Sequence, residues 1–581
     1  MMRLHAVLAG LASIFIAHAA SAACQLKLAE LKVTMAGLRP LIPVKVDGVD
    51  AMFLIDTGAF YSTISVANAA RFGLRTSSLP MEMRGIGGTV PLGVTTVKTF
   101  TIANTPIKNL EFVVGGNELG GEMAGIIGQN ILSRFDVEYD LANGAIRLGI
   151  PHGCSGNLAY WAKDGPVSVL PFDPGARLDL HIVGNVKLNG MNMRALFDTG
   201  APATTVTLQA ARRAGIRVDG PGVIGGGRMG GFGRKTVRAW IAPFDSVEIG
   251  GIKVLRTKLE IGDFNIGEDL LVGDDFFLSN RVFVSNTQHR MYFTYNGGRM
   301  FNLEHVREGA VPPTSAAASA VASENPTDAD GFARRGSALL ARGEVERALA
   351  DLTHACELAP NEPRYRYRRA LALLDHKDLA GGTADLDRAI ALKVDDPEML
   401  LTRARLRFQA KNREGARTDL DAASAALPEQ ADQRLLVAAA YEALDAFEPA
   451  VRNYDRWIKV HADSSRYDQA LNNRCWASAL GNIDVNTGLA ACDRAVGRTA
   501  RAANTLDSRG LMHLRRAEYA RAIADYDAAL AKRPNMGWSL YGRGIAKLKA
   551  GDKPGGEADL AAADKIAPKL AERAKGYGIA P

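Results

Sequence analysis

The chain has 581 residues, of which 47% are hydrophobic and 23% are charged, and its 70 basic and 63 acidic side chains leave a formal net charge of +7. These proportions are typical of a folded globular protein and exclude a largely disordered or collagen-like chain, and the length predicts several domains. Because basic and acidic residues are mixed along the chain without long runs of one sign, the composition gives no indication of nucleic-acid binding.

Residues 1–23 have the pattern of a secretory signal peptide. An early Arg3 is followed by an apolar stretch over residues 6–17 and then by small residues, so cleavage is expected near Ala22/Ala23. The apolar stretch is shorter than the ~20 residues that a bilayer crossing needs, which makes a retained membrane anchor the weaker alternative. No later segment is long and apolar enough to span a membrane. The pattern predicts a periplasmic or secreted protein.

The next part of the chain, to about residue 300, is predicted to be mostly β-structure and contains an internal duplication. Short apolar runs are broken by Gly, Asn, Asp and Pro, which is typical of strands and turns. The run FLIDTGA at 53–59 recurs as ALFDTGA at 195–201, an offset of 142 residues. We therefore expect a first lobe over 24–150, an inter-lobe connection over 151–176 and a second lobe over 177–300.

Further matches keep nearly the same offset. Residues 69–74 correspond to 211–216, and the triplet Ile-Ile-Gly at 126–128 corresponds to Leu-Val-Gly at 271–273. A single Asp-Thr-Gly tripeptide is weak evidence, but two in matched contexts strongly indicate a duplicated lobe. The second lobe differs from the first in carrying Asp274 and Asp275 directly after its glycine.

With these motifs the chain resembles the aspartic protease superfamily, and most closely its bacterial and retroviral retropepsin-like branch. Each lobe of that family supplies an Asp-Thr-Gly loop, a glycine-rich flap and a strand that ends apolar-apolar-Gly. The resemblance implies an all-β fold of two acid-protease-like barrels and hydrolysis of peptide bonds in a peptide or protein substrate. It also implies a catalytic pair, Asp56 and Asp198, on loops supported by Thr57, Gly58, Thr199 and Gly200, with hydrogen bonds of the two threonines bracing the loops against each other.

The paired aspartates suit the expected chemistry. Two carboxyl groups about 3 Å apart cannot both ionise, so the pair holds one proton and titrates as a unit. The ionised aspartate activates a water molecule, and the protonated one donates to the scissile carbonyl oxygen. No metal or organic cofactor is required. The sequence leaves open which aspartate is protonated, the pH optimum and the cleavage preference, although Ala59 and Ala201, where pepsin-like enzymes usually have Ser or Thr, suggest by resemblance a less acidic optimum.

Two glycine-rich segments are candidates for the flaps. Glycine suits a hairpin that opens for substrate and then closes over it. The candidate residues are Gly85, Ile86, Gly87 and Gly88 in the first lobe, and Gly225, Gly226 and Gly227, within the run 224–233, in the second. The second run also contains a GxGxxG pattern, but we reject dinucleotide binding because no Rossmann unit follows it.

The C-terminal half is predicted to be an all-α solenoid. After a flexible linker at 308–328, a 34-residue period runs from 329 to 570, followed by a tail at 571–581. The period and its small residues resemble about seven tetratricopeptide repeats, an architecture that commonly binds peptides or proteins. The repeats are thus expected to recruit a protein partner or substrate. The alternative is that the protease-like lobes are inactive and that the whole chain is a binding scaffold.

Five cysteines allow two disulfides with one residue left over. The repeat register places Cys475 and Cys492 on facing helices of the fifth hairpin, where a disulfide is plausible, and two buried free thiols are the alternative. A second bridge, from Cys24 to Cys154, would tie the chain start to the end of the first lobe. Lipid attachment at Cys24 stays open, although Ser21 stands where lipoprotein signals usually have leucine.

Overall fold

The computed structural model describes residues 24–116, 123–162, 165–173, 180–233, 235–301 and 325–581. The predicted signal peptide and residues 308–324 of the predicted linker lie outside these ranges. The chain divides into two compact units, and the division falls between Val394 and Asp395. Within the described ranges, no helix combines the length and the apolar character needed to cross a bilayer.

The first lobe is a β-sheet that closes on itself. Its strands are β2 (Thr34–Ala36), β3 (Arg39–Val46), β4 (Val49–Ile55), β5 (Thr63–Ile64), β6 (Ser77–Gly85), β7 (Gly88–Ile102), β8 (Thr105–Val114) and β9 (Met123–Ile127). They pair in the order β2-β3-β4-β9-β5-β8-β7-β6, and a further pairing of β3 with β7 closes a barrel. Phe53, Phe100 and Phe112 pack edge to face in its buried interior. Two short helices, α2 (Val66–Arg71) and α3 (Gln129–Leu132), complete the lobe.

The second lobe repeats this arrangement. Its strands are β13 (Val183–Leu188), β14 (Met191–Phe197), β15 (Thr205–Thr207), β16 (Ile224–Met229), β17 (Val237–Ile249), β18 (Ile252–Gly262) and β19 (Leu270–Val272). Here β13 pairs with β17 to close the barrel. The short helices α4 (Leu208–Arg213) and α5 (Asp274–Phe277) correspond to α2 and α3. The two-lobed, all-β fold predicted from the sequence is confirmed.

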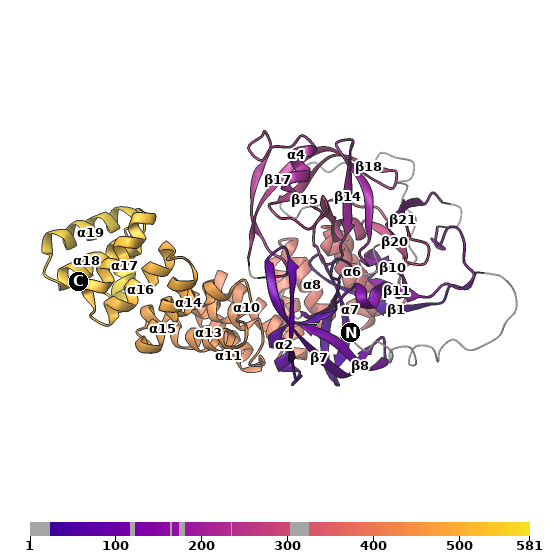
Figure 1. Cartoon of the computed structure of the whole chain (residues 1–581). Helices are drawn as coiled ribbons and strands as arrows, with labels where there is room; N and C mark the ends of the chain where they lie inside the picture. Colours follow the sequence, from indigo (N-terminus) through magenta and orange to yellow (C-terminus); the bar gives the residue numbers. More distant parts are fainter. Residues whose placement is uncertain (1–23, 117–122, 163–164, 174–179, 234, 302–324) are drawn as a thin grey trace. The chain divides into compact units, whose positions relative to one another are not determined.

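A third sheet joins the lobes, and nothing in the sequence pattern indicated it. Its strands pair in the order β1 (Leu28–Lys32), β11 (Ala145–Gly149), β10 (Asp136–Asp140), β20 (Asn280–Ser285), β21 (Arg290–Tyr295) and β12 (Ser168–Pro171), with η2 (Leu141–Asn143) between β10 and β11 (Figure 1). The central pair, β10 and β20, comes from different lobes. The buried carboxylate of Glu138 binds Arg147 at 2.6 Å and Arg281 at 2.7 Å, so an ion cluster also links the lobes.

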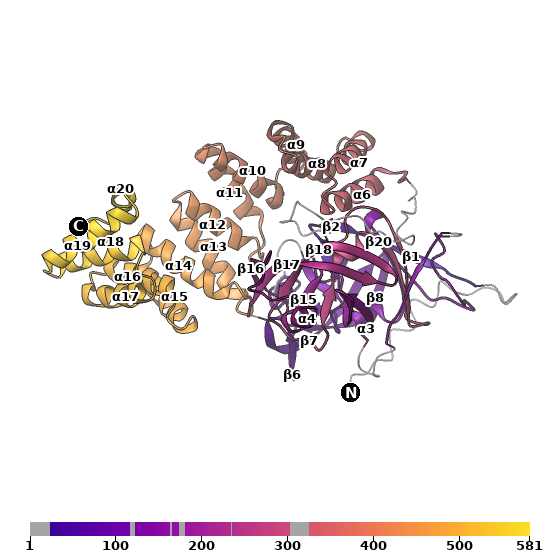
Figure 2. The same ribbon diagram turned by 90° about the horizontal axis from the view of Figure 1, so that it is seen from above.

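The first compact unit also includes four helices, α6 (Ala329–Ala341), α7 (Val345–Leu358), α8 (Pro363–Asp375) and α9 (Leu379–Leu392). Helix α6 lies against β2, as Figure 2 shows, and its Ala338 belongs to the same hydrophobic core as the lobes. Arg334, only 8% exposed, donates from Nη1 to the carbonyl oxygen of Gly144 at 2.5 Å. The first helical hairpin is therefore built into the β-structure.

The second compact unit is entirely helical in its described residues. It contains α10 (Pro397–Gln409), α11 (Arg413–Ala426), α12 (Arg434–Ala443), α13 (Phe447–Val460), α14 (Tyr467–Gly481), α15 (Val485–Arg498), α16 (Ala503–Arg515), α17 (Tyr519–Lys532), α18 (Gly537–Lys549), α19 (Lys553–Ile566) and α20 (Leu570–Gly576). The predicted helical repeat region is confirmed. Helix α20 covers the last hairpin with the buried side chains of Leu570 and Ala574, where the sequence predicted only a tail.

Arginine–aspartate pairs recur within the hairpins. In five of the hairpins in the described residues, an arginine binds an aspartate 16 residues later through two nitrogen–oxygen contacts: Arg335–Asp351, Arg369–Asp385, Arg403–Asp419, Arg509–Asp525 and Arg543–Asp559. The residue in phase with these arginines in the fifth hairpin is Cys475, which forms a disulfide with Cys492. A second disulfide joins Cys24 to Cys154, and Cys356 is a buried free thiol.

Candidate active site

The two Asp-Thr-Gly loops follow the ends of buried strands. In the first lobe β4 runs parallel to β9, and in the second lobe β14 runs parallel to β19 in the same register. The backbone N–H of Asp56 donates to the carbonyl oxygen of Ile127 at 3.0 Å, and that of Asp198 donates to Val272 at 2.9 Å. Each aspartate is therefore fixed to the strand that ends apolar-apolar-Gly.

Thr57 and Thr199 brace the two loops against each other. The N–H of Thr57 donates to Oγ1 of Thr199 at 3.1 Å, and the N–H of Thr199 donates to Oγ1 of Thr57 at 2.9 Å. Each hydroxyl also donates across to the opposite lobe, Thr57 to the carbonyl of Phe197 at 2.7 Å and Thr199 to that of Ile55 at 2.8 Å. Both threonines are fully buried, so these four bonds form away from competing water.

The glycines of the two loops allow the carboxyl groups to approach. A Cβ atom on Gly58 would lie 2.3 Å from Cγ of Asp198, and one on Gly200 would lie 2.3 Å from Cγ of Asp56. Any larger residue would therefore push the opposite carboxyl group away. The N–H of Ala59 donates to Asp56 at 2.8 Å, and that of Gly200 donates to Asp198 at 2.8 Å, which fixes both side chains in place.

The two aspartates form a coupled pair, and burial raises the pKa of both. Burial, then the charge of Asp198, then a hydrogen bond between the two carboxyl groups raise the pKa of Asp56 well above its usual value. Burial also raises the pKa of Asp198, but hydrogen bonds from Gly200 and from Asp56 oppose that rise. Burial and the proximity of the second carboxyl group therefore favour a pair that shares one proton.

Two basic residues flank the pair at equivalent positions. Arg39 and His181 are separated by 142 residues, the offset of the duplication, and both line the cavity above the aspartates. His181 places Nε2 3.2 Å from the carbonyl oxygen of Gly58, so it contacts the loop of the opposite lobe. Burial dominates the pKa of Asp198, and His181 opposes its effect. Neither basic residue stood out in the sequence, although the same offset relates them.

The residues that follow the two apolar-apolar-Gly strands differ in chemistry but share a backbone arrangement. Asn130 accepts from the N–H and the hydroxyl of Ser62, both at 2.8 Å. Asp275 accepts in the same way from Thr204, at 3.0 and 2.6 Å. Burial raises the pKa of Asp275 to about 6, against the effect of these hydrogen bonds. The second lobe therefore keeps the local fold despite its two aspartates.

Asp274 is a third carboxyl group close to the pair. It is fully buried, and neither of its carboxyl oxygens has a hydrogen-bond partner among the described residues. Burial, followed by the charges of Asp198, Asp275 and Asp56, raises the pKa of Asp274 well above its usual value, whereas Arg39 acts in the opposite direction. Burial in turn lowers the pKa of Arg39, against the effect of Asp274. This carboxyl group therefore favours its neutral form.

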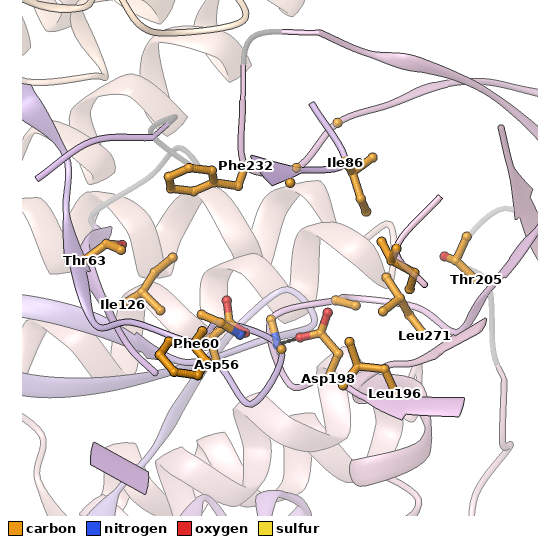
Figure 3. Close-up of a pocket in the computed structure, with 18 of the residues that line it drawn as sticks. Asp56, Phe60, Thr63, Ile86, Ile126, Leu196, Asp198, Thr205, Phe232 and Leu271 are labelled. Carbon is orange, nitrogen blue, oxygen red and sulfur yellow. Dashed lines mark hydrogen bonds between the residues drawn. The ribbon is translucent and has the colours of Figure 1, made fainter. Parts of the chain in front are cut away.

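A cavity of about 770 Å³ lies above the two aspartates. Figure 3 shows Asp56 and Asp198 on one side of it, with Ile86 and Phe232 on the other. Side chains from both lobes line the remaining walls, among them Ile126 and residues of the second lobe. Within the described residues, no three His, Cys, Asp or Glu side chains are grouped as a metal site would require.

Two hairpins cover the cavity. In the first lobe β6 and β7 meet at a turn in which Gly85 pairs with Gly88, around Ile86 and Gly87. In the second lobe β16 and β17 form the hairpin, and Met229 at the end of β16 lines the cavity together with residues 230–232 beyond it. The predicted flap residues Gly225, Gly226 and Gly227 lie instead within β16, at a register shift, and do not line the cavity.

The two hairpin tips contact each other. The N–H of Gly87 donates to the carbonyl of Phe232 at 2.8 Å, and the N–H of Lys235 donates to the carbonyl of Gly87 at 2.8 Å. The ring of Phe232 packs against Gly116 so closely that a Cβ there would lie 2.2 Å from it. Ile86 packs against the second-lobe cluster around Leu271. Each tip therefore rests on the opposite lobe.

Comparison with protein families agrees with this geometry. Residues 42–131 match the aspartyl protease family, and residues 184–279 match the gag-polyprotein putative aspartyl protease family. The chain contains two aspartyl protease lobes. The two matches begin 142 residues apart, which is also the separation of Thr57 and Thr199. A search of curated proteins found no match.

Solved structures similar to the chain include proteins of helical repeats. A tetratricopeptide repeat protein from Parabacteroides merdae is 16% identical, covers 43% of this chain and 98% of its own, and gives a TM-score of 0.30. The MamA protein is 15% identical over 30% of this chain and 94% of its own, with a TM-score of 0.25. YrrB, described as a TPR protein with an unusual peptide-binding site, is 13% identical over 39% and 97%, with a TM-score of 0.24.

Proposed function

We propose that the chain is an exported aspartic endopeptidase whose catalytic pair is Asp56 and Asp198. The observation that carries this proposal is the close approach of Asp56 and Asp198 on equivalent loops, each carboxyl group lying against the glycine of the opposite loop, beneath a cavity covered by two hairpins. Both family matches support the same class of activity. A single chain supplies both aspartates, so no second copy is needed to complete the pair.

The protonation of the pair supports distinct roles for the two aspartates. The ionised aspartate of the pair acts as the general base toward a water molecule between the carboxyl groups. The protonated aspartate donates to the scissile carbonyl oxygen as the tetrahedral intermediate forms. The roles then exchange as the proton passes to the leaving amine. No cofactor takes part in these steps.

The hairpins supply the remaining requirement, which is a site closed to bulk water. Closure strengthens the electrostatic interactions of the pair with a bound peptide and excludes competing water. The contacts of Gly87 and Phe232 join the two tips, so binding requires that these backbone hydrogen bonds break. The hairpins therefore act as flaps that separate to admit an extended peptide and close over it.

Export and partner recruitment complete the proposal. The sequence pattern of residues 1–23 favours removal of a signal peptide, and two disulfides are consistent with an oxidising periplasmic or extracellular location. The helical repeats recruit a substrate or a partner protein, which raises the local concentration of peptide near the lobes.

The test is cleavage of a random-peptide library by the mature protein and by its Asp56→Asn and Asp198→Asn variants. We expect the wild type to cut, a pepstatin-like transition-state mimic to block cutting, and either substitution to abolish it. Circular dichroism confirms that the variants are folded. If all three folded proteins are inert while the repeats still capture a protein partner, the chain is an inactive protease-fold scaffold.

A further inference from the structure

The C-terminal segment, residues 577–581, follows helix α20 and contacts the first helices of the last two hairpins. Figure 2 shows α20 beside α18, the first helix of the seventh hairpin. Arg515, the last residue of α16, donates from Nη2 to the carbonyl oxygen of Tyr577 at 2.6 Å and from Nη1 to that of Gly578 at 3.2 Å. The hydroxyl of Tyr541, on α18, donates to the carbonyl oxygen of Ile579 at 3.3 Å. The sixth and seventh hairpins therefore bind three successive backbone carbonyls of this segment.

The same segment reaches the fourth hairpin. The hydroxyl of Tyr577 donates to Oδ1 of Asp445, which lies in the turn between α12 and α13 and stands 132 residues earlier in the chain. The ring of Tyr577 meets that of Phe447, the first residue of α13, edge to face with centroids 5.3 Å apart. Arg515 also donates to the carbonyl oxygen of Leu480 at 2.8 Å, near the end of α14. One short segment therefore joins four hairpins, the fifth of them through a shared guanidinium.

These contacts combine general recognition of a backbone with recognition of two side chains. Arg515 and Tyr541 bind backbone carbonyls, which every residue offers. The ring and the hydroxyl of Tyr577 are held by side chains of the fourth hairpin. Ile579 is only 4% exposed and belongs to the hydrophobic cluster of the array. Protein surfaces bind peptides in this way, with main-chain hydrogen bonds for affinity and side-chain sites for selectivity.

The segment lies on the surface of the hairpins, so it can leave without the opening of a hairpin. Tyr577 is half-buried, and Gly578 and Ala580 are exposed. The backbone N–H groups of residues 577–579 donate to carbonyls of α20, whereas the contacts with the fourth, sixth and seventh hairpins come from carbonyl oxygens and side chains. A peptide with the same carbonyls and side chains therefore competes for the same groups.

We propose that this surface of the fourth to seventh hairpins is the peptide-binding site of the helical array, and that the C-terminal segment occupies it as an internal ligand. The partner is a peptide in which an aromatic residue is followed two positions later by an aliphatic one, as Tyr577 is by Ile579. The inference rests on the recruitment of a partner in the proposed function and is independent of catalysis. Recruitment then requires the partner to displace the segment, which lowers its apparent affinity by the fraction of open chains.

The experiment measures the binding of a labelled peptide of residues 575–581 to the full chain and to a shortened variant that ends at Gly576. Both proteins carry Asp56→Asn, so that the peptide is not cut during the measurement. We expect the shortened variant to bind the peptide about tenfold more tightly or better, because the open state of the full chain is the minor one. Peptides with alanine in place of Tyr577 or Ile579 should bind about tenfold more weakly. A random-peptide library selected on the shortened variant should return aromatic-x-aliphatic sequences.

Asp445→Asn tests the surface from the side of the array. Asparagine tolerates the positive φ of 56° at this position but removes the charge that accepts from the tyrosine hydroxyl. Peptide binding by the shortened variant should weaken about fivefold, because a charge-assisted hydrogen bond becomes a neutral one. Asp468→Asn is the matched control, since it removes the same charge from an ion pair with Arg498 in the fifth hairpin, and it should leave peptide binding unchanged.

Hydrogen exchange in the full chain provides a readout that does not need the shortened variant. The N–H of Ile579 donates to the carbonyl oxygen of Ala574 at 2.9 Å, which protects it from exchange while the segment is bound. An excess of the peptide should therefore speed exchange of the amides of residues 577–579.

Three results would overturn the inference. They are equal binding of the peptide to the full chain and the shortened variant, no binding by a folded shortened variant, and dimers of the full chain that exchange residues 577–581 between copies. If the shortened variant does not fold, exchange in the full chain decides: faster exchange with the peptide supports the surface, and unchanged exchange overturns it.

The outcomes also separate this inference from the proposed function. Capture of a protein partner that the peptide does not reduce leaves recruitment intact and overturns this surface. Cleavage of the peptide library is measured separately and decides the protease alone. An inactive protease therefore leaves the binding result unchanged, and a failed peptide site leaves the protease intact.

Discussion

Asp274 occupies in the second lobe the position that Gln129 occupies in the first, one residue after the glycine that ends the buried strand. Gln129 donates from Nε2 to the carbonyl oxygen of Thr57 at 3.2 Å, whereas the carboxyl oxygens of Asp274 have no such partner among the described residues. Two nearly identical loops therefore have different buried neighbours, and only one of these neighbours titrates.

The stability of the first unit should depend on pH through Asp274. Its raised pKa means that the folded state holds this proton more tightly than the unfolded chain does. The resulting stabilisation is complete below the pKa of an unfolded aspartate, about 4, and is lost as the pH rises through the folded-state value. Relative to wild type, Asp274→Asn should therefore gain about 1 to 3 kcal/mol between acidic and mildly alkaline pH. Urea unfolding across this range measures the change.

Gln129→Glu is the matched control for this prediction. It places a carboxyl group of nearly the same shape at the equivalent position of the first lobe, so it should destabilise the fold increasingly as the pH rises. Equal pH dependence of the wild type and of Asp274→Asn would contradict the assignment of a tightly held proton to Asp274.

The threonine brace should be essential for the geometry of the pair. Thr57→Val removes the hydroxyl that accepts from Thr199 and donates to Phe197, both inside the protein. Loss of these two buried hydrogen bonds should cost about 2 to 4 kcal/mol. Thr57→Ser keeps the hydroxyl and should retain most of the stability. Thermal unfolding of the two variants separates a loss of hydrogen bonds from a loss of the methyl group.

Cleavage should follow a bell-shaped pH profile whose two limbs are set by the aspartate pair. Burial raises the pKa of both aspartates, so the form with one proton persists to higher pH than in an exposed pair. We expect kcat/KM to decrease at pH values below about 4, which is the ordinary carboxyl pKa. The activity should extend into weakly acidic or neutral pH. A maximum well below that value would contradict the effect of burial described above.

The contact between helix α6 and the lobes should contribute to the stability of the first unit. Arg334→Ala removes the charged donor to the carbonyl of Gly144, which keeps only the N–H of Val33, and it opens space where a side chain only 8% exposed had packed. We expect a loss of about 2 to 4 kcal/mol, because a buried charged hydrogen bond and its packing disappear together. Arg347→Ala, on the neighbouring helix, removes an exposed arginine bound to Glu344 and should change stability by less than about 1 kcal/mol.

Reduction of the Cys475–Cys492 bridge should weaken the fifth hairpin. The bridge closes a loop with a sequence separation of 17 residues, for which the chain-entropy model gives about 3 kcal/mol. Cys475→Ser with Cys492→Ser should lower the free energy of unfolding of the helical unit by this amount and so lower its melting temperature, and wild type under reducing conditions should match the double variant. Cys356→Ser tests for a general effect of thiol removal and should not reproduce the loss.

The sequence indicated the parts of the site that lie within one repeated motif. Asp56, Asp198 and their threonines occur in a duplicated run, so their neighbours in the chain are also their neighbours in space. Arg39 begins β3 and His181 lies just before β13, so both are far in the chain from the aspartates, and His181 contacts the loop of the opposite lobe only in the folded protein. A single basic residue has no local signature, and only the 142-residue offset connects the two.

Two other features were beyond local patterns. The sheet that joins the lobes pairs β10 with β20. Their partner residues Val137 and Val284 lie far apart in the chain, and the sequence of each strand looks like that of any other strand. In the second flap, seven glycines from residue 222 to residue 233 give no side-chain pattern that fixes the strand pairing, so the sequence did not show that Gly225 and Gly227 belong to β16 and that Phe232 lines the cavity. Tertiary pairing decided both outcomes.

The packing of helix α6 against the lobes restricts where recombination can join a different repeat array to these lobes. Composition changes near the linker, yet the first two helical hairpins belong to the same compact unit as the lobes, which extends to Val394. A recombination breakpoint placed in the linker would separate Arg334 from the carbonyl of Gly144. It would also expose the apolar surface of the lobes against which helix α6 packs. A breakpoint after α9 would preserve both. Repeat arrays with different partners could therefore be exchanged behind the same lobes only if the donor array joins downstream of the fourth helix.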